Sequence, residues 1–176
     1  MERLLNILTN PDKRRIWILN RKYCPNMAMI EGKAEVLYSY DPVGQETPFS
    51  YDAIRNIEFY NYKTFVQAYK DERREILDYD APELRLMAVW SFYKNVHKDD
   101  VLLFVHGSEI EGYYVVTGEH VECRNEEDFS LHSWEAETIR FSRPVCIASR
   151  FGSPFFKIIG DFKREVVAAI KKALQS

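Results

Sequence analysis

Apolar and polar residues follow one another along this chain in short segments that have the length of β-strands and are separated by turn residues. The clearest case is a pair of β-rich runs, residues 101–105 and 112–117, which flank a Gly107-Ser108 turn. We expect these two runs to form a hairpin. Residues 155–159 are ambiguous between a strand and a helix. Further runs of strand character, either alternating or continuously apolar, span residues 15–19, 33–40, 137–141 and 145–148.

Apolar residues at helical spacing occur between these strands and again near the last residue. The final helix is the clearest, because Gly160 and Asp161 precede an amphipathic segment that we place at residues 161–175. Polar residues predict a loop over residues 120–133. Because strands are interrupted by helices and include a hairpin, we expect an α+β fold with a small β-barrel. Other segments with helical spacing are residues 2–8, 50–57, 65–77 and 83–90.

The composition is that of an ordinary globular domain, with 46% hydrophobic and 29% charged residues. A length of 176 residues fits one domain, so we treat residues 1–176 as a single unit. No apolar run approaches the roughly 18 residues of a membrane span, and the N-terminus lacks a signal-peptide pattern. Three widely separated cysteines imply no disulfide framework. We therefore expect a cytoplasmic protein.

The charges are distributed unevenly, although the formal net charge is only −3. Residues 138–176 contain eight lysines and arginines against two acidic residues, and residues 11–33 contain six against two. The stretch between them, residues 34–137, contains 9 basic and 22 acidic residues. Two interpretations remain open. Either the fold has one basic and one acidic face, as nucleic-acid-binding proteins do, or each element is solvated by its own charges.

The sequence lacks the motifs of several enzyme classes. None of the seven glycines begins a phosphate-binding pattern of the Walker or dinucleotide type, which excludes those two routes to nucleotide binding. His120, Cys123, His132 and Cys146 lack the twice-paired spacing of a structural zinc site, so we expect no metal. Ser108 follows a glycine without the rest of a nucleophile-elbow motif. We therefore expect a non-catalytic domain without a cofactor.

Aromatic residues are abundant, with 11 tyrosines and 11 phenylalanines, and some of them stand in polar surroundings. Trp134 lies in the polar stretch DFSLHSWEAET shortly after Phe129, whereas the other two tryptophans lie in apolar segments typical of a core. Tyr38 and Tyr40 end a predicted strand and share one side of it. Rings that converge in this way can sandwich a flat base, at roughly 1–3 kcal/mol per stacked base. Alternatively, these aromatics fold down as a lid on the core.

Three stretches of sequence resemble the PUA-like superfamily, and specifically its EVE and YTH branches. The first, IWILNRKYCPN, is similar to the family's opening strand and pocket-lining loop. The second, FYKNVHKDDVLLFVHGSEIEGYYVVTGEH, resembles its helix, glycine-aspartate turn, buried strand and hairpin. The third, AETIRF, follows Phe129 and Trp134 as a late YTH strand follows its cage aromatics. The likeness covers residues 14–147 and is greatest to the DNA-reading domains that precede the GTP-hydrolysing motor of archaeal McrB-type modification-dependent restriction proteins.

The sequence departs from this family pattern at three positions. Lys98 takes the place of the glycine in the glycine-aspartate turn. Tyr38 or Tyr40 takes the place of the first cage tryptophan, and Phe129 that of another. Phenylalanine and tyrosine still stack, so these departures concern the choice of base more than the fold.

The resemblance implies a small twisted β-barrel surrounded by helices, and a function in accepting a modified base, such as a methylated one, flipped out of duplex DNA. The walls of the base pocket would be aromatic: Trp134, Phe129, Tyr38 and Tyr40. The loop after the first strand would read the base edge, through Asn20, Tyr23 and Asn26. Phosphates would be held, without sequence specificity, by basic residues: Arg21, Lys22, Arg140, Arg143 and Arg150.

Two other functions remain open at this point. The same fold serves RNA-binding YTH-like or PUA-like modules, which would contact the 2′-hydroxyl. A protein-interaction domain would use the aromatics as core and lid and bind no nucleic acid. The expected partner is DNA with a modified base, with RNA as the alternative, and oligomerisation through a motor domain would fit the family.

Overall fold

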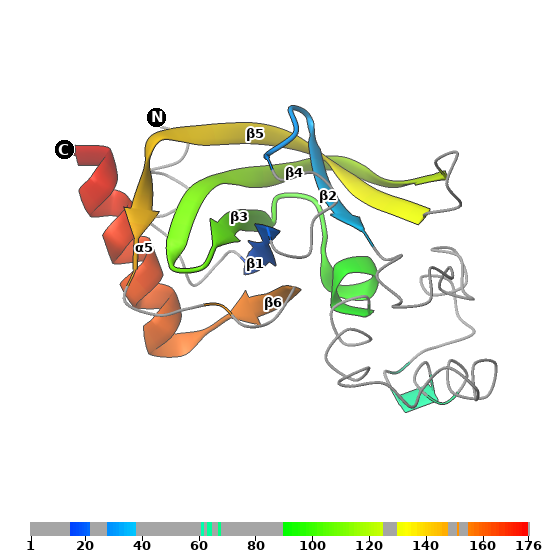
Figure 1. The fold of residues 1–176 in the computed structure, drawn as a ribbon. Helices are drawn as coiled ribbons and strands as arrows, with labels where there is room; N and C mark the ends of the chain where they lie inside the picture. The colour runs from blue at the N-terminus through cyan, green and yellow to red at the C-terminus, as the bar shows by residue number, and fades with distance from the viewer. Residues whose placement is uncertain are drawn as a thin grey trace.

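The computed structural model describes residues 15–21, 28–37, 61, 63–64, 67, 90–124, 130–147, 151 and 155–175 (Figure 1). The strands are β1 Ile16–Asn20, β2 Lys33–Leu37, β3 Val101–His106, β4 Glu109–Arg124, β5 Ser130–Cys146 and β6 Phe155–Ile158. The named helical elements are the π-helix η3, Ser91–Asn95, and the α-helix α5, Gly160–Gln175. The helices expected at 2–8, 50–57, 65–77 and 83–90 lie wholly or mostly outside the described residues.

The six strands form one mixed sheet in the order β2-β5-β4-β3-β1-β6. β1 and β3 are parallel, whereas every other neighbouring pair is antiparallel. Figure 1 shows β4 and β5 as long curved strands that arch over β3 and β1, with α5 beside the last part of β5. The α+β class is therefore confirmed. Among the described strands, the edges β2 and β6 do not pair with each other, so the sheet is not closed into the expected barrel.

Several expected elements are confirmed. β3 and β4 form the hairpin, and Gly107 in its turn has a φ of 62°, a backbone conformation that glycine adopts without strain. The final helix is α5. The ambiguous residues 155–159 provide the strand β6, which pairs with β1.

The predicted polar loop over residues 120–133 is wrong. Residues 120–124 continue β4 and residues 130–133 continue β5, with pairs from His120↔Trp134 to Arg124↔Ser130. The separate strands expected at 137–141 and 145–148 are likewise parts of β5, which is 17 residues long, except that residues 147–148 lie beyond its end. Polar side chains do not prevent this extension, because an antiparallel ladder satisfies the backbone whatever the side chains are.

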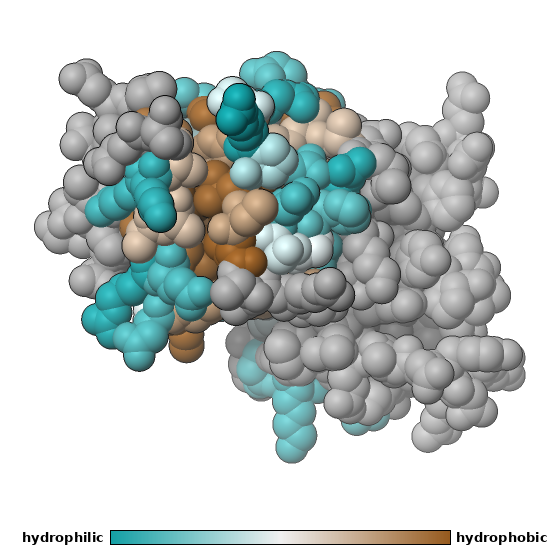
Figure 2. Space-filling view, turned by 60° about the vertical axis from the view of Figure 1, so that its left-hand side comes forward, coloured by the Kyte–Doolittle hydropathy of each residue, from teal (hydrophilic) through white to brown (hydrophobic). Residues whose placement is uncertain are grey.

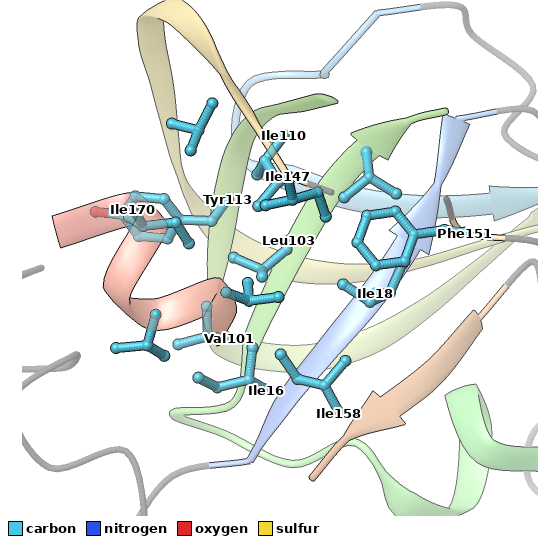
Figure 3. Close-up of a cluster of buried hydrophobic side chains, with 14 of the residues drawn as sticks. Ile16, Ile18, Val101, Leu103, Ile110, Tyr113, Ile147, Phe151, Ile158 and Ile170 are labelled. Carbon is cyan, nitrogen blue, oxygen red and sulfur yellow. The ribbon is translucent and has the colours of Figure 1, made fainter. Parts of the chain in front are cut away.

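The central strands bury side chains on both of their faces. On one face, Ile18 of β1 and Leu103 of β3 belong to the same buried cluster as Ile170 of α5 (Figure 3). On the other face, Leu19 and Phe104 are also buried, and they are direct neighbours in the register of β1 and β3. Covering both faces explains why β1 and β3 read as continuous apolar runs instead of alternating ones.

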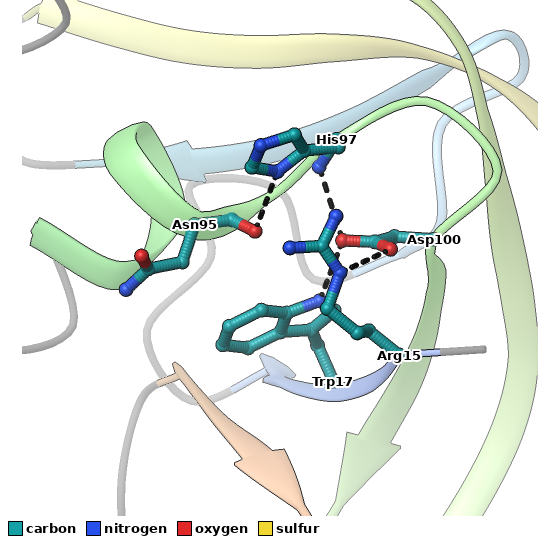
Figure 4. Close-up of polar contacts among 5 residues, drawn as sticks. All are labelled: Arg15, Trp17, Asn95, His97 and Asp100. Atoms are coloured by element: carbon teal, nitrogen blue, oxygen red, sulfur yellow. Dashed lines mark hydrogen bonds and ion pairs between the residues drawn. The ribbon is translucent and has the colours of Figure 1, made fainter. Parts of the chain in front are cut away.

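Asp100 joins the start of β3 to the start of β1 (Figure 4). Its carboxylate accepts hydrogen bonds from Arg15 Nε at 3.0 Å, from Trp17 Nε1 at 2.9 Å and from the main-chain N–H of His97 at 3.0 Å. The residue is only 4% exposed, and three donors, one of them cationic, replace the water that a buried carboxylate loses. Next to it, the N–H of Val101 donates to the carbonyl of Arg15 at 3.1 Å.

The turn before β3, residues 97–100, contains one residue in the left-handed region. Asp99, and not Lys98, has a positive φ, of 69°. The N–H of Asp100 donates to the carbonyl of His97 at 3.1 Å and closes the turn. Turns of type II require positive φ at the third residue, where glycine is preferred. Aspartate visits this region more readily than most residues, which explains how Asp99 occupies the position without a glycine.

Candidate nucleic-acid interface

Trp134 is part of the core. It lies within β5, between Ala34 of β2 and His120 of β4, and is 3% exposed. The expectation of a ring standing in a polar loop is therefore wrong. Side chains alternate along a strand, so the exposed Glu135 lies on the opposite face of β5 from Trp134. The exposure of Glu135 therefore does not predict exposure of Trp134.

The ring of Trp134 packs edge-to-face against two other rings. Its centroid lies 6.4 Å from that of Phe92, at 69°, and 5.5 Å from that of His120, at 75°. The row continues through Phe155, which is 5.2 Å from Phe92 and stacks on Trp17 at 5.1 Å with parallel planes. We call these five residues the aromatic row. The row thus connects β1 and β6 with η3, β4 and β5 through packed rings.

Phe92 and His120 were not expected from the sequence to belong to this row. Phe92 lies in η3, and its carbonyl accepts a hydrogen bond from Trp134 Nε1 at 3.2 Å. His120 was considered only as a zinc ligand, whereas its ring packs between Phe92 and Trp134. Among the residues that the structure describes, no three His, Cys, Asp or Glu side chains are grouped closely enough to hold a metal ion. Nothing in the sequence indicated that His120 faces inward, because the extension of β4 to residue 124 was not predicted.

Seven of the predicted site residues lie outside the described part of the chain: Tyr23, Asn26, Tyr38, Tyr40, Phe129, Lys22 and Arg150. Two of them directly adjoin paired strand ends. Tyr38 follows Leu37, which pairs with Leu131, and Phe129 precedes Ser130, which pairs with Arg124. The ends of β2 and β5 that adjoin Tyr38 and Phe129 are therefore neighbours in the sheet.

Asn20 does not lie in the loop where the sequence placed it. It is the last residue of β1, is 2% exposed, and donates a hydrogen bond of 2.9 Å from its side-chain amide to the carbonyl of Phe151. This contact crosses from β1 to the segment before β6. Asn20 thus supports the fold from inside, instead of facing solvent.

The described arginines differ in their availability for phosphate. Arg21 forms an ion pair with Glu111 at 2.6 Å, and Arg140 donates to the carbonyl of Met29. Arg143 of β5 is exposed and has no ion-pair partner among the described residues. Of the three described arginines that were predicted to bind phosphate, Arg143 is therefore the one that makes no side-chain hydrogen bond or ion pair with another described residue.

More basic side chains occur in the elements that follow β5. Figure 2, which brings forward the side of the molecule where α5 lies, shows hydrophilic residues around a strip of apolar ones. The basic residues of β6 and α5 are all at least partly exposed: Lys157, Lys163, Arg164, Lys171 and Lys172. They provide positive charge on the same stretch of chain for which the sequence predicted it.

Comparisons with known proteins give no assignment: no family model, no curated protein and no solved structure matches this chain. Within the described residues, none of the helices is long and apolar enough to cross a membrane.

Proposed function

We propose that this chain is a non-catalytic DNA-binding domain of the PUA-like class, which accepts a modified base flipped out of the duplex. The base would enter beside the neighbouring ends of β2 and β5. One observation carries the proposal. The strand ends that adjoin Tyr38 and Phe129 are neighbours in the sheet, and Trp134 of the same strand β5 packs in the aromatic row, so a base pocket at these strand ends would adjoin a well-packed part of the sheet.

The burial of Trp134 changes its part in this proposal. A ring that is 3% exposed, with its N–H bound to Phe92, supports the pocket and does not clasp the base. The stacking walls are then Tyr38, Tyr40 and Phe129. Stacking contributes roughly 1–3 kcal/mol per base, which is enough to offset the few kcal/mol needed to extrude a base from the helix.

Arg143 would contact the DNA backbone, together with the basic residues of α5. Such contacts fix the position of the duplex but do not read its sequence. They also release counterions, so the affinity should fall as salt is raised. The described strands form an open sheet, so the closed barrel of the PUA-like class is itself part of what we propose.

The test is a binding panel of duplexes that are unmodified or carry N6-methyladenine, 5-methylcytosine or 5-hydroxymethylcytosine, together with a methylated RNA of the same sequence. We expect one modified duplex to bind at least about tenfold more tightly than the unmodified one, as roughly 1–3 kcal/mol of stacking allows. Phe129→Ala should remove that preference. Phe162→Ala on α5, a half-buried phenylalanine distant in sequence from the proposed pocket, is the matched control.

Three outcomes would contradict the proposal. Tighter binding of the RNA would indicate a reader of RNA, because such proteins use the 2′-hydroxyl. Equal binding of all duplexes would leave a general DNA-binding domain without a base pocket. Absence of binding to either nucleic acid at modest salt would favour a protein-interaction domain.

A further inference from the structure

The outer side of α5 carries charges of both signs. Four charged residues of this helix are exposed: Asp161, Arg164, Glu165 and Lys172. Asp161 and Arg164 form an ion pair with each other. Within the part of the chain that the structure describes, neither Glu165 nor Lys172 has an ion-pair partner. Two opposite charges, seven residues apart on one helix, are therefore exposed to solvent without compensation from the described residues.

Glu165 and Lys172 belong to one ridge of the helix. Residues at positions i, i+3, i+4 and i+7 share a face of an α-helix. Between the two charges these positions hold alanines, Ala168, which is exposed, and Ala169, which is half-buried. We call these four residues the α5 ridge. Its middle is small and apolar, and its two ends have opposite charge.

The inner side of α5 fixes the helix to the rest of the fold. Val166, Val167 and Ile170 are buried in the core cluster, where they pack with residues of β1, β3 and β4 (Figure 3). A helix that is packed along one side presents its outer ridge in a fixed shape. A partner can then dock on the ridge without the cost of ordering a mobile segment.

The α5 ridge is complementary to itself when two copies pack in antiparallel order. A two-fold axis between Ala168 and Ala169 places Glu165 of one copy opposite Lys172 of the other, and the symmetry repeats this pair. In parallel order each charge would face its own kind, which is unfavourable. Alanines at the crossing allow the helix axes to approach to about 8 Å, at which distance long charged side chains can reach across.

We infer that the α5 ridge binds the same ridge of a second copy of this chain, in antiparallel order, through two symmetry-related ion pairs between Glu165 and Lys172. The inference does not rest on the proposed function. The contact of two single helices is small, and interfaces that bury less than about 1,200 Å² belong to weak complexes. The dimer is therefore weak, and because its ion pairs are exposed at the rim, salt weakens it further.

Sedimentation equilibrium of the full chain, at concentrations up to about 1 mM and at low and high salt, measures the dissociation constant of the dimer. The variants are Glu165→Lys, Lys172→Glu and the double exchange of both. Lys171→Glu is the matched control, because it makes the same change of charge at the neighbouring residue, outside the ridge. Thermal unfolding at high dilution checks that each variant is folded.

We expect each single exchange to weaken the dimer about tenfold or more, because both ion pairs become contacts between like charges. The double exchange should restore the dimer. An equimolar mixture of Glu165→Lys and Lys172→Glu should also restore it, since each changed position then faces an opposite charge in the other variant. Lys171→Glu should change the dissociation constant by no more than about twofold.

The double exchange separates this pairing from a role of the charges within one helix. Exchanging the two charges opposes the helix dipole, so a purely internal role predicts lower stability and no recovery of the dimer.

Four results would overturn the inference. The first is a wild-type chain that stays monomeric over the whole range of concentration. The second is a dimer that neither single exchange weakens, because another surface would then form it. The third is weakening by the single exchanges without recovery in the double exchange. The fourth is an equal loss for Lys171→Glu and Lys172→Glu, since net charge alone would explain it. The panel of modified duplexes tests the proposed function separately.

Discussion

The indole N–H of Trp134, in β5, donates a hydrogen bond of 3.2 Å to the main-chain carbonyl of Phe92, in the π-helix η3. The bond ties the sheet to the turn that leads into β3. It also joins two residues that pack edge-to-face, so a single side chain contributes both a polar and an apolar contact.

Trp134→Ala should destabilise the protein by about 3–5 kcal/mol, because it removes a large buried ring and leaves a cavity. Trp134→Phe should cost less, about 1–3 kcal/mol, since it keeps much of the ring packing but removes the donor to Phe92. Urea denaturation measures both values. Ile159→Ala is the control, because Ile159 is 69% exposed and its truncation should be nearly neutral. An unchanged midpoint for Trp134→Ala would show that the ring is not in the core.

Asp100→Asn should destabilise the protein by about 2–3 kcal/mol. An asparagine keeps only one acceptor oxygen, so its NH2 group would face either Arg15 or the two donors of Trp17 and His97, and donors do not bind one another. At least one hydrogen bond to a charged group is therefore lost. The free energy of unfolding from chemical denaturation measures the effect. The matched change Asp99→Asn, at an exposed position where asparagine also tolerates positive φ, should stay within about 0.5 kcal/mol. Equal effects at both positions would rule out the buried role of Asp100.

Asp99→Val should destabilise the protein by about 1–2 kcal/mol, because a β-branched side chain is strained at a φ of 69°. Asp99→Gly should not, since glycine adopts that conformation freely. Lys98→Val is the control at the neighbouring exposed residue, whose φ is not positive. Thermal unfolding of the three variants separates the cases. A larger loss of stability for Lys98→Val than for Asp99→Val would contradict the left-handed backbone conformation of Asp99.

Arg143→Ala should weaken binding of modified and unmodified duplexes alike, because a phosphate contact carries no sequence information. The slope of log affinity against log salt should become shallower by about 1, the share of one phosphate. Arg143→Lys should keep most of that slope, since it keeps the charge. Titrations at several salt concentrations provide the measurement. A loss confined to the modified duplex would instead mean that Arg143 reads the base.

Sequence patterns predicted the elements whose neighbours along the chain are also their neighbours in space. The hairpin of β3 and β4 is one example, because the turn at Gly107 and the two flanking runs specify it locally. The helix α5 is another, with its apolar side facing the cluster around Ile170. The extension of β4 and β5 was not predictable in this way. It depends on His120 and Trp134 meeting across the sheet, and their local sequence is polar.

The candidate site shows the same division. The exposure expected for Trp134 and Asn20 was wrong, because both residues are buried. Arg140 donates a hydrogen bond to the carbonyl of Met29, a contact that the sequence did not indicate. The hydrogen bonds that Thr138 and Tyr114 form with the main chain of Ile30 had no sequence signal, because Ile30 is more than 80 residues away from both along the chain.

The amino-acid sequence alone determined the α+β class, the buried strands β1 and β3, the hairpin and the final helix, because apolar periodicity and turn residues act over a few neighbouring positions. Only the tertiary structure decided which face of each strand is buried and which polar groups are paired. Periodicity shows which residues share a face, but burial depends on the strand or helix that covers that face, and hydrogen-bond partners such as Asp100 and Trp17 come together only when β1 and β3 align.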